Sequence, residues 1–181
     1  MGVPFIIGAP VTLDKKNKQY GNAALYFDKE GNYKGYFAKM HLVPFAEIIP
    51  GIEYEWVRNL LKKVVGISGG WTSGKYLTMF DIPLKNADSV KISTPICFED
   101  AFPAVCRPFY NLGSEVFVNI TNDSWSLTKS AEYQHFVIAS YRAIEYRTTM
   151  IRSTNSGYSV VVNPVGKVIA DLPLFEEKSL Y

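Results

Sequence analysis

The sequence predicts a single α/β domain over residues 1–181, in which a mixed sheet carries a hairpin. Seven apolar runs rich in β-branched and aromatic residues are bounded by Gly, Pro or Asn, which is typical of strands. Two segments between the later runs, 102–112 and 130–147, have helical patterns, so strands and helices alternate as in crossover units. The seven expected strands are 3–9, 22–28, 33–39, 90–97, 115–121, 148–154 and 158–164.

The second and third expected strands are joined by the four residues "KEGN". A short connection with Gly and Asn favours a tight turn, so these two strands should pair as an antiparallel hairpin. The composition, with 48% hydrophobic and 20% charged residues in a chain of 181, indicates a globular domain with a sizeable core.

The segment 53–66 has apolar residues at helical spacing on one side and charged residues on the other, and it ends at Gly66. It predicts an amphipathic helix, which could cover the sheet or lie in a membrane interface. The glycine-rich stretch 66–76 that follows contains Trp71. We expect it to be mobile and to serve as a lid or a docking surface.

Several classes of function are disfavoured by the composition. The net charge is only +2 and the charges are scattered, so nucleic acid is not an expected partner. The longest apolar stretch, 3–11, is too short to cross a bilayer, and it lacks the flanks of a signal peptide. The two cysteines do not suggest a disulfide framework or a metal site, and no cofactor is expected.

Cys97 lies between an expected strand and an expected helix, in the stretch "TPICFEDAFP". If the strand continues through Phe98, the side chains of Cys97 and Glu99 point to the same face. A cysteine at such a place, with charged neighbours, is expected to have a lowered thiol pKa, although a buried core thiol is an equally good interpretation. Cys106 falls within a helical segment and is better explained as a core residue.

Other residues that could carry chemistry have ordinary structural interpretations when they are taken singly. Lys39 closes an expected strand and Glu47 follows in a loop, and both would normally be solvated charges. Asn122 and Trp125 follow another strand, where Asn usually stabilises a turn. His135 lies in a helical segment, where a lone His is more often structural than catalytic.

Four segments together resemble the carbon-nitrogen hydrolase domain of apolipoprotein N-acyltransferases, which belong to the nitrilase superfamily. The resemblance runs through nearly the whole chain, and its first and last segments favour the acyltransferase branch over the soluble amidases. The four segments are "YFAKMHLVPFAEIIPG", "TPICFEDAFP", "VNITNDSW" and "QHFVIASYRAIEYRTTMIRSTNSGYSVVVNPVGKV".

The resemblance implies a nitrilase-like αββα sandwich that is incomplete at its N-terminus, and a catalytic triad of Glu, Lys and Cys. Cys97 matches the nucleophile and Lys39 the lysine of the triad. Glu47 matches a further glutamate of the acyltransferase site, and Glu99 matches the glutamate two positions after the nucleophile.

Residues outside the triad are expected to form the lid or to contact substrate, namely Trp71, Trp125 and Asn122. The chain departs from the family pattern at Ser126 and Leu127, where Phe-Gly is preferred, and at Ala46, where Gly is usual. These departures are expected to affect the lid.

The reaction implied by the resemblance moves an acyl chain from a phospholipid, through a cysteine thioester, to the N-terminal amine of a diacylglyceryl-cysteine lipoprotein. The expected partners are therefore a phospholipid donor, a lipoprotein acceptor and a membrane surface. The implied location is the bacterial inner membrane, with the domain on the periplasmic side. Two alternatives stay open: a soluble nitrilase-type amidase, and a noncatalytic truncated remnant.

The family's general-base glutamate, first strands and transmembrane bundle all correspond to sequence N-terminal to Met1. No residue of this chain is therefore assigned the role of the base. The chain is expected to be either part of a longer protein or a shortened gene product that works with a segment supplying the N-terminal half.

Overall fold

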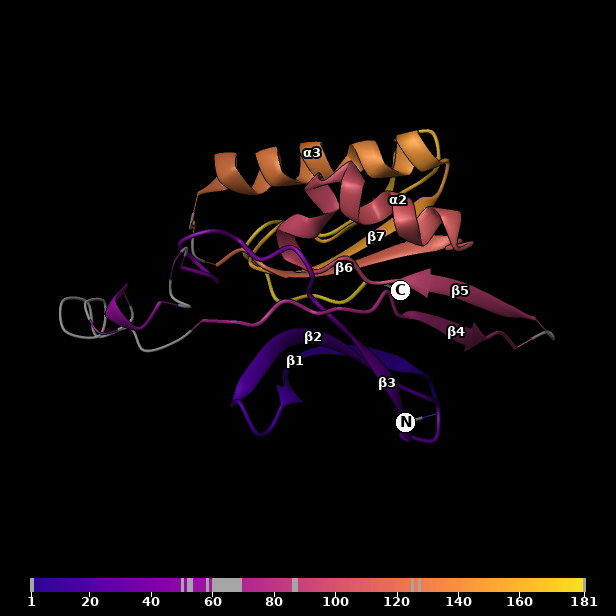
Figure 1. Cartoon of the computed structure of the whole chain (residues 1–181). Coiled ribbons are helices and arrows are strands. Elements are labelled where there is room, and N and C mark those ends of the chain that lie inside the picture. The colour runs from indigo at the N-terminus through magenta and orange to yellow at the C-terminus, as the bar shows by residue number, and fades with distance from the viewer. Residues whose placement is uncertain are drawn as a thin grey trace.

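The described elements of the chain form three layers, which confirms the α/β class (Figure 1). Two helices lie over one face of a six-stranded sheet, and a three-stranded sheet lies against its other face. The computed structural model describes residues 2–49, 51, 54–57, 59, 70–85, 88–124, 126 and 128–180.

The three-stranded sheet is an antiparallel meander of β1 (Phe5–Asp14), β2 (Gln19–Phe27) and β3 (Tyr33–Ala38). The predicted hairpin is confirmed as β2 and β3, and its turn is closed by the Asp28 carboxylate, which accepts hydrogen bonds from the backbone N–H groups of Glu30 and Asn32. The prediction that the hairpin belongs to the mixed sheet is wrong. Buried apolar residues of the hairpin and of the larger sheet belong to one cluster, so the two sheets pack face to face.

The six-stranded sheet has the order β4-β5-β6-β7-β8-β9, with parallel pairing only between β5, β6 and β7. The two predicted helices are confirmed as the crossovers that join these parallel strands. The bounds of these elements are β4 Met79–Pro83, β5 Ser89–Ser93, α2 Pro103–Asn111, β6 Val116–Asn122, α3 Lys129–Tyr146, β7 Thr149–Asn155, β8 Val160–Val162 and β9 Val168–Asp171.

The strand expected at 90–97 ends earlier, at Ser93. Pro95 has no N–H to donate to a sheet, and Cys97 begins a short 3₁₀ helix, η1 (Cys97–Ala101). Cys97 and Glu99 therefore do not alternate along a strand, and the expectation that they share a face for that reason is wrong.

The core joins all three layers. Phe37 of β3 and Phe109 of α2 are fully buried, and their rings meet edge to face with centroids 5.2 Å apart. Phe117 of β6 and Met150 of β7 are also fully buried in the same cluster. Helices and both sheets thus bury one continuous apolar interior.

Most of the helix predicted at 53–66, and the Ile67–Gly69 part of the stretch predicted to be mobile, lie outside the described residues. Within the described part of the chain, no helix has the length and hydrophobicity that a membrane crossing requires.

We predict that Phe109→Ala lowers the free energy of unfolding by about 3–5 kcal/mol, because it leaves a cavity where the helix layer meets the three-stranded sheet. Urea unfolding followed by circular dichroism measures this change. Leu112→Ala, at a side chain that is 53% exposed, is the control and should change stability by less than about 0.5 kcal/mol. Equal losses in the two variants would contradict the prediction.

Candidate active site

Cys97 is held in an unusual backbone conformation at the start of η1. Its φ is +52°, in the left-handed region that non-glycine residues seldom adopt. The amide of Asn119 on β6 donates hydrogen bonds of 2.9 Å to the carbonyls of both Pro95 and Cys97. Asn119 therefore stabilises a turn that would cost about 1–3 kcal/mol without support.

Glu99 ties the turn at Cys97 to the end of β3. One carboxylate oxygen accepts hydrogen bonds from the backbone N–H groups of Met40 (2.7 Å) and His41 (2.8 Å), and the other accepts from Ile96 N–H (2.8 Å). The side chain is fully buried. Burial raises the pKa of Glu99, and the backbone hydrogen bonds and the charge of Lys39 oppose this shift.

Lys39 and Glu47 form a partly buried ion pair next to this junction. The ammonium of Lys39, which is fully buried, lies 2.6 Å from the Glu47 carboxylate, and the same oxygen accepts the backbone N–H of Val43 at 2.8 Å. The positive charge of Lys39 favours the thiolate form of Cys97, so it lowers the pKa of that thiol. The structure thus brings together the nucleophile candidate and two of the charged residues singled out in the sequence.

A cavity of about 650 Å³ opens between the two sheets beside Cys97. Of the other residues predicted for the site, Glu47, Trp71 and Asn122 also line it, whereas Trp125 lies outside the described residues. The rest of the wall comes from β1, from Asn22 of β2, from Ile96 and from the ends of β6 and β7. The described site is therefore an open cleft between the sheets.

Trp71 is fixed to the ion-pair loop by its backbone. Its N–H donates to the carbonyl of Glu47 at 2.9 Å. The preceding residue must be small, since a Cβ atom at Gly70 would lie only 2.7 Å from that carbonyl oxygen. The Asn122 side-chain oxygen accepts from Ser124 and from the Asn155 amide, so it joins the ends of β6 and β7.

The thiol of Cys97 is not poised as a free thiolate. Burial raises its pKa, and the charge of Asp123 raises it further, while Lys39 and a hydrogen bond with Thr121 lower it. The expectation of a lowered thiol pKa is therefore wrong, because desolvation outweighs the nearby positive charge. The thiol needs a proton acceptor before it can attack a substrate.

A cluster of four buried charged side chains lies behind Cys97, and the sequence reasoning missed it. His135 of α3 lies 3.0 Å from an Asp100 oxygen and 3.1 Å from both oxygens of Asp123, and Arg152 of β7 pairs with both aspartates. Burial disfavours the imidazolium, but the hydrogen bonds to Asp100 and Asp123 raise the pKa of His135 to about 9. The signal that could have found the cluster is Arg152. It lies two residues after the apolar Met150 and shares the buried face of the strand with it, and a buried arginine needs charged partners.

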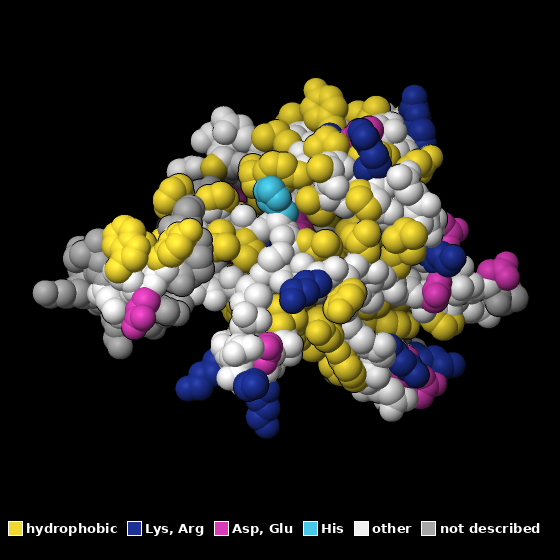
Figure 2. Space-filling view, in the orientation of Figure 1, with side chains coloured by type: hydrophobic (Ala, Val, Ile, Leu, Met, Phe, Trp, Pro, Cys, Tyr) yellow, Lys and Arg dark blue, Asp and Glu magenta, His cyan; other side chains and the backbone are white. Residues whose placement is uncertain are grey.

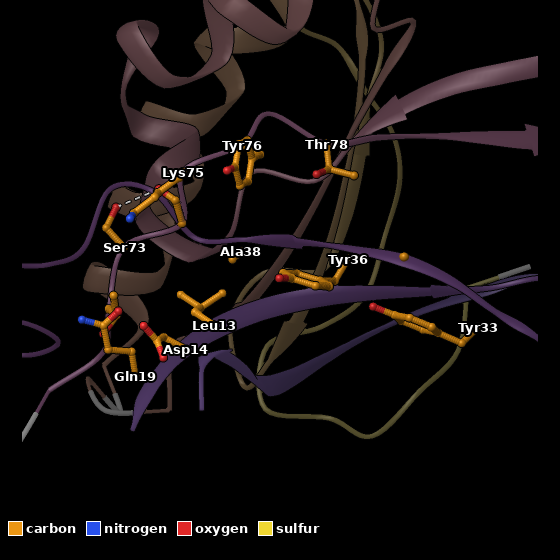
Figure 3. A pocket seen from close by; sticks show the side chains of 13 residues that line it. Leu13, Asp14, Gln19, Tyr33, Tyr36, Ala38, Ser73, Lys75, Tyr76 and Thr78 are labelled. Atoms are coloured by element: carbon orange, nitrogen blue, oxygen red, sulfur yellow. Dashed lines mark hydrogen bonds between the residues drawn. The ribbon is translucent and has the colours of Figure 1, made fainter. Parts of the chain in front are cut away.

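A second cavity, of about 570 Å³, lies against the three-stranded sheet (Figure 3). It is bounded by β1 to β3 and by the segment Thr72–Thr78, with Tyr33, Tyr36 and Tyr76 among its walls. Among the residues predicted for the site, none of those that the structure describes lines this cavity. The cleft at Cys97 is therefore the candidate active site.

Cys106 is fully buried in α2, and burial strongly raises the pKa of its thiol. Both cysteines are free. The interpretation of Cys106 as a core residue is confirmed by its complete burial.

We predict that Glu99→Gln lowers the free energy of unfolding by about 1–3 kcal/mol, because an amide NH₂ would face a backbone N–H that now donates to a carboxylate oxygen. Denaturant unfolding measures the loss. The matched control is Glu115→Gln, in which an exposed carboxylate that also accepts a backbone N–H is replaced. A loss at position 99 no greater than that at position 115 would count against the role given to Glu99.

We predict a pH dependence of stability from His135, whose pKa rises from the usual 6.5 to about 9. A histidine whose pKa is raised in the folded state stabilises the fold, and this contribution to the free energy of unfolding, about 3 kcal/mol, is fully present below about pH 6.5. It is lost as the pH rises toward 9. Thermal unfolding between pH 6 and about 8, below the range where unfolded thiols ionise, measures it. His135→Gln should flatten the profile; an unchanged slope would contradict the prediction.

Comparison with known proteins agrees with this geometry. The chain is 56% identical to apolipoprotein N-acyltransferase 2 of Treponema denticola, over 98% of this chain and 33% of that protein. It is 39% identical to apolipoprotein N-acyltransferase of Borreliella burgdorferi, over 97% of this chain and 32% of that protein. The resemblance drawn from the four segments is thereby confirmed. The chain spans about a third of the length of these curated relatives.

Solved structures share the fold at low sequence identity. Saccharomyces cerevisiae Nit3, a member of the nitrilase superfamily, matches 95% of this chain and 55% of its own with a TM-score of 0.65 and 18% identity. An amidase from Nesterenkonia sp. matches 96% of this chain and 58% of its own with a TM-score of 0.67 and 17% identity. The fold is thus nitrilase-like. The family model for carbon-nitrogen hydrolase matches residues 1–181, and the chain belongs to the carbon-nitrogen hydrolase family.

Proposed function

We propose that this chain carries the nucleophile of an N-acyltransferase, which moves an acyl chain from a phospholipid to the N-terminal amine of a diacylglyceryl-cysteine lipoprotein. One observation carries the proposal. Cys97 shares a cleft with Glu47, whose carboxylate holds the buried Lys39 ammonium at 2.6 Å. The relatives named apolipoprotein N-acyltransferase supply the substrate class.

In the first half-reaction, the sulfur of Cys97 attacks the carbonyl carbon of the phospholipid ester. A C–S bond forms, the ester C–O bond breaks, and lysophospholipid leaves with the proton that the thiol gives up. The Lys39 ammonium would stabilise the oxyanion that develops on the carbonyl oxygen. Glu47 would keep that ammonium in place and Glu99 would keep the Cys97 turn against it.

In the second half-reaction, the lipoprotein amine attacks the thioester carbon. A C–N bond forms, the C–S bond breaks, and one amine proton returns to the sulfur. Because the pKa of Cys97 is raised, proton transfer needs a base, typically worth about 10²–10⁴-fold in rate. The family pattern assigns that base to a glutamate N-terminal to Met1, so the proposal includes a segment that supplies it.

The surroundings of Glu47 suit a membrane surface and two lipid substrates. Phe45 is 81% exposed and Trp56 is 69% exposed, and Ile48 and Tyr54 are exposed as well. Figure 2 shows a few exposed hydrophobic side chains on the described part of the projection at the left of the molecule. Exposed apolar clusters of this kind mark interaction sites. We propose that Phe45, Ile48, Tyr54 and Trp56 meet the bilayer. We also propose that the domain lies on the periplasmic side of the inner membrane, with Trp71, Trp125 and Asn122 at the substrate entrance.

We predict that incubation with phosphatidylethanolamine vesicles gives an acyl adduct on Cys97 that hydroxylamine removes. Intact-mass spectrometry would detect it in the chain alone and in the chain with any sequence encoded upstream of Met1 restored. The adduct should be stronger in the restored form, because that form supplies the base. Added diacylglyceryl-cysteine peptide should then discharge the adduct and become N-acylated.

Cys97→Ala is the control and should give no adduct, whereas Cys106→Ala should leave it unchanged. Hydrolysis of a small amide such as butyramide without any lipid adduct would favour the soluble amidase instead. No adduct and no hydrolysis in either form would leave the noncatalytic remnant.

A further inference from the structure

The buried cluster behind Cys97 joins four elements through one imidazole. His135 on α3 contacts Asp100 in η1 through Nε2 and Asp123 after β6 through Nδ1. Arg152 on β7 lies 3.2 Å from Asp100 and 3.7 Å from Asp123. Glu132 is a further buried carboxylate on α3. The two aspartates are thus balanced by one permanent cation and by His135.

The charge state of His135 decides how many of these elements it holds. An imidazolium donates from both ring nitrogens, so it can bind Asp100 and Asp123 at the same time. A neutral imidazole has one N–H; with that proton on Nε2 it keeps Asp100, and Nδ1 can accept from Arg152 Nη2, which lies 3.2 Å away. Asp123 then loses its partner on α3.

Each of the two aspartates is linked to Cys97 through a neighbouring residue or element. Asp100 lies in the same 3₁₀ helix as Cys97. Phe98, which follows Cys97 directly, has its ring centroid 5.4 Å from that of the His135 imidazole. On the other side, the Thr121 hydroxyl donates to Asp123 at 3.1 Å, and Thr121 lines the same cleft as Cys97, where it lowers the pKa of the thiol. His135 therefore reaches Cys97 by two routes without touching it.

The Thr121 hydroxyl has a single hydrogen, which can go to Asp123 or to a thiolate on Cys97, but not to both. Asp123 can release it only if other donors satisfy its carboxylate. His135 and Arg152 are those donors. The negative charge of Asp123, if left unbalanced, would also oppose formation of the thiolate.

We propose that His135 is a positioning residue for Cys97: as an imidazolium bound to both Asp100 and Asp123, it fixes the turn that presents the thiol and releases the Thr121 hydroxyl to the thiolate. The inference rests on the proposed role of Cys97 as nucleophile. Apart from the hydrogen bonds, only the S–H bond of Cys97 breaks in this step, and its proton is bound by the base as the thiolate forms.

The test is the pH profile of Cys97 alkylation by iodoacetamide, read by peptide mass spectrometry, which needs no lipid. The charged groups that face Cys97 are Lys39, Glu47 and Asp123. The test variants change only residues of the buried cluster, so Lys39 and Glu47 stay as they are. His135→Gln leaves an excess negative charge, so it should shift the apparent thiol pKa upward and slow alkylation at pH 8 by about 10-fold.

Asp123→Asn should have the opposite effect, because it removes the charge that raises the thiol pKa. Opposite directions in the two variants separate positioning from general loss of structure, which would move both the same way. His41→Gln is the matched control: it is the same substitution at the other histidine, whose exposed ring packs on Phe102. It should leave the profile unchanged.

Asp100→Asn keeps the test usable if His135→Gln does not fold, and it should slow alkylation by loosening the turn. Identical profiles for wild type, His135→Gln and Asp123→Asn, with native circular dichroism, would overturn the proposal. Failure of the proposed function looks different: Cys97 alkylation would still respond to His135, but wild-type protein would form no acyl adduct with phospholipid.

Discussion

The site depends on one carboxylate that accepts three backbone hydrogen bonds. Glu99 bonds the amides of Met40 and His41 at the end of the three-stranded sheet, and the amide of Ile96 at the end of β5 in the six-stranded sheet. Each of these segments leaves a strand with N–H groups that no ladder satisfies, and burial would make them costly if unpaired. Glu99 satisfies them together, and the distance between Lys39 and Cys97 is fixed as a result.

The electrostatics of the cleft follow from burial more than from any single charge. Desolvation raises the pKa of Cys97 and of Glu99 alike, and the positive charges nearby are already engaged: Lys39 by Glu47, and Arg152 by the two aspartates. Because the nearby positive charges are already paired with carboxylates, the thiol of Cys97 stays in its neutral form. Reactivity then depends on a proton acceptor and on a substrate whose developing charge Lys39 can meet.

Sequence reasoning found what local pattern controls. Alternation and turn residues gave the hairpin and the two crossover helices, and the conspicuous segments held Cys97, Lys39 and Glu47. It missed β4 and β9, which are short edge strands, and it placed Cys97 on a strand that Pro95 ends. The contacts of Asn119 and Arg152 could not be predicted, since they arise because these residues are register partners across β6 and β7, and register is set by tertiary packing.

That register explains why the support of Cys97 comes from the sheet and not from its own segment. Adjacent residues in a parallel pair point to the same face, so Asn119 reaches the Cys97 turn while Arg152 reaches the aspartates on either side of it. A five-residue 3₁₀ helix beginning at positive φ has little stability of its own. The nucleophile is therefore positioned by side chains from β6, β7 and α3, and its geometry is only as firm as the packing of those elements.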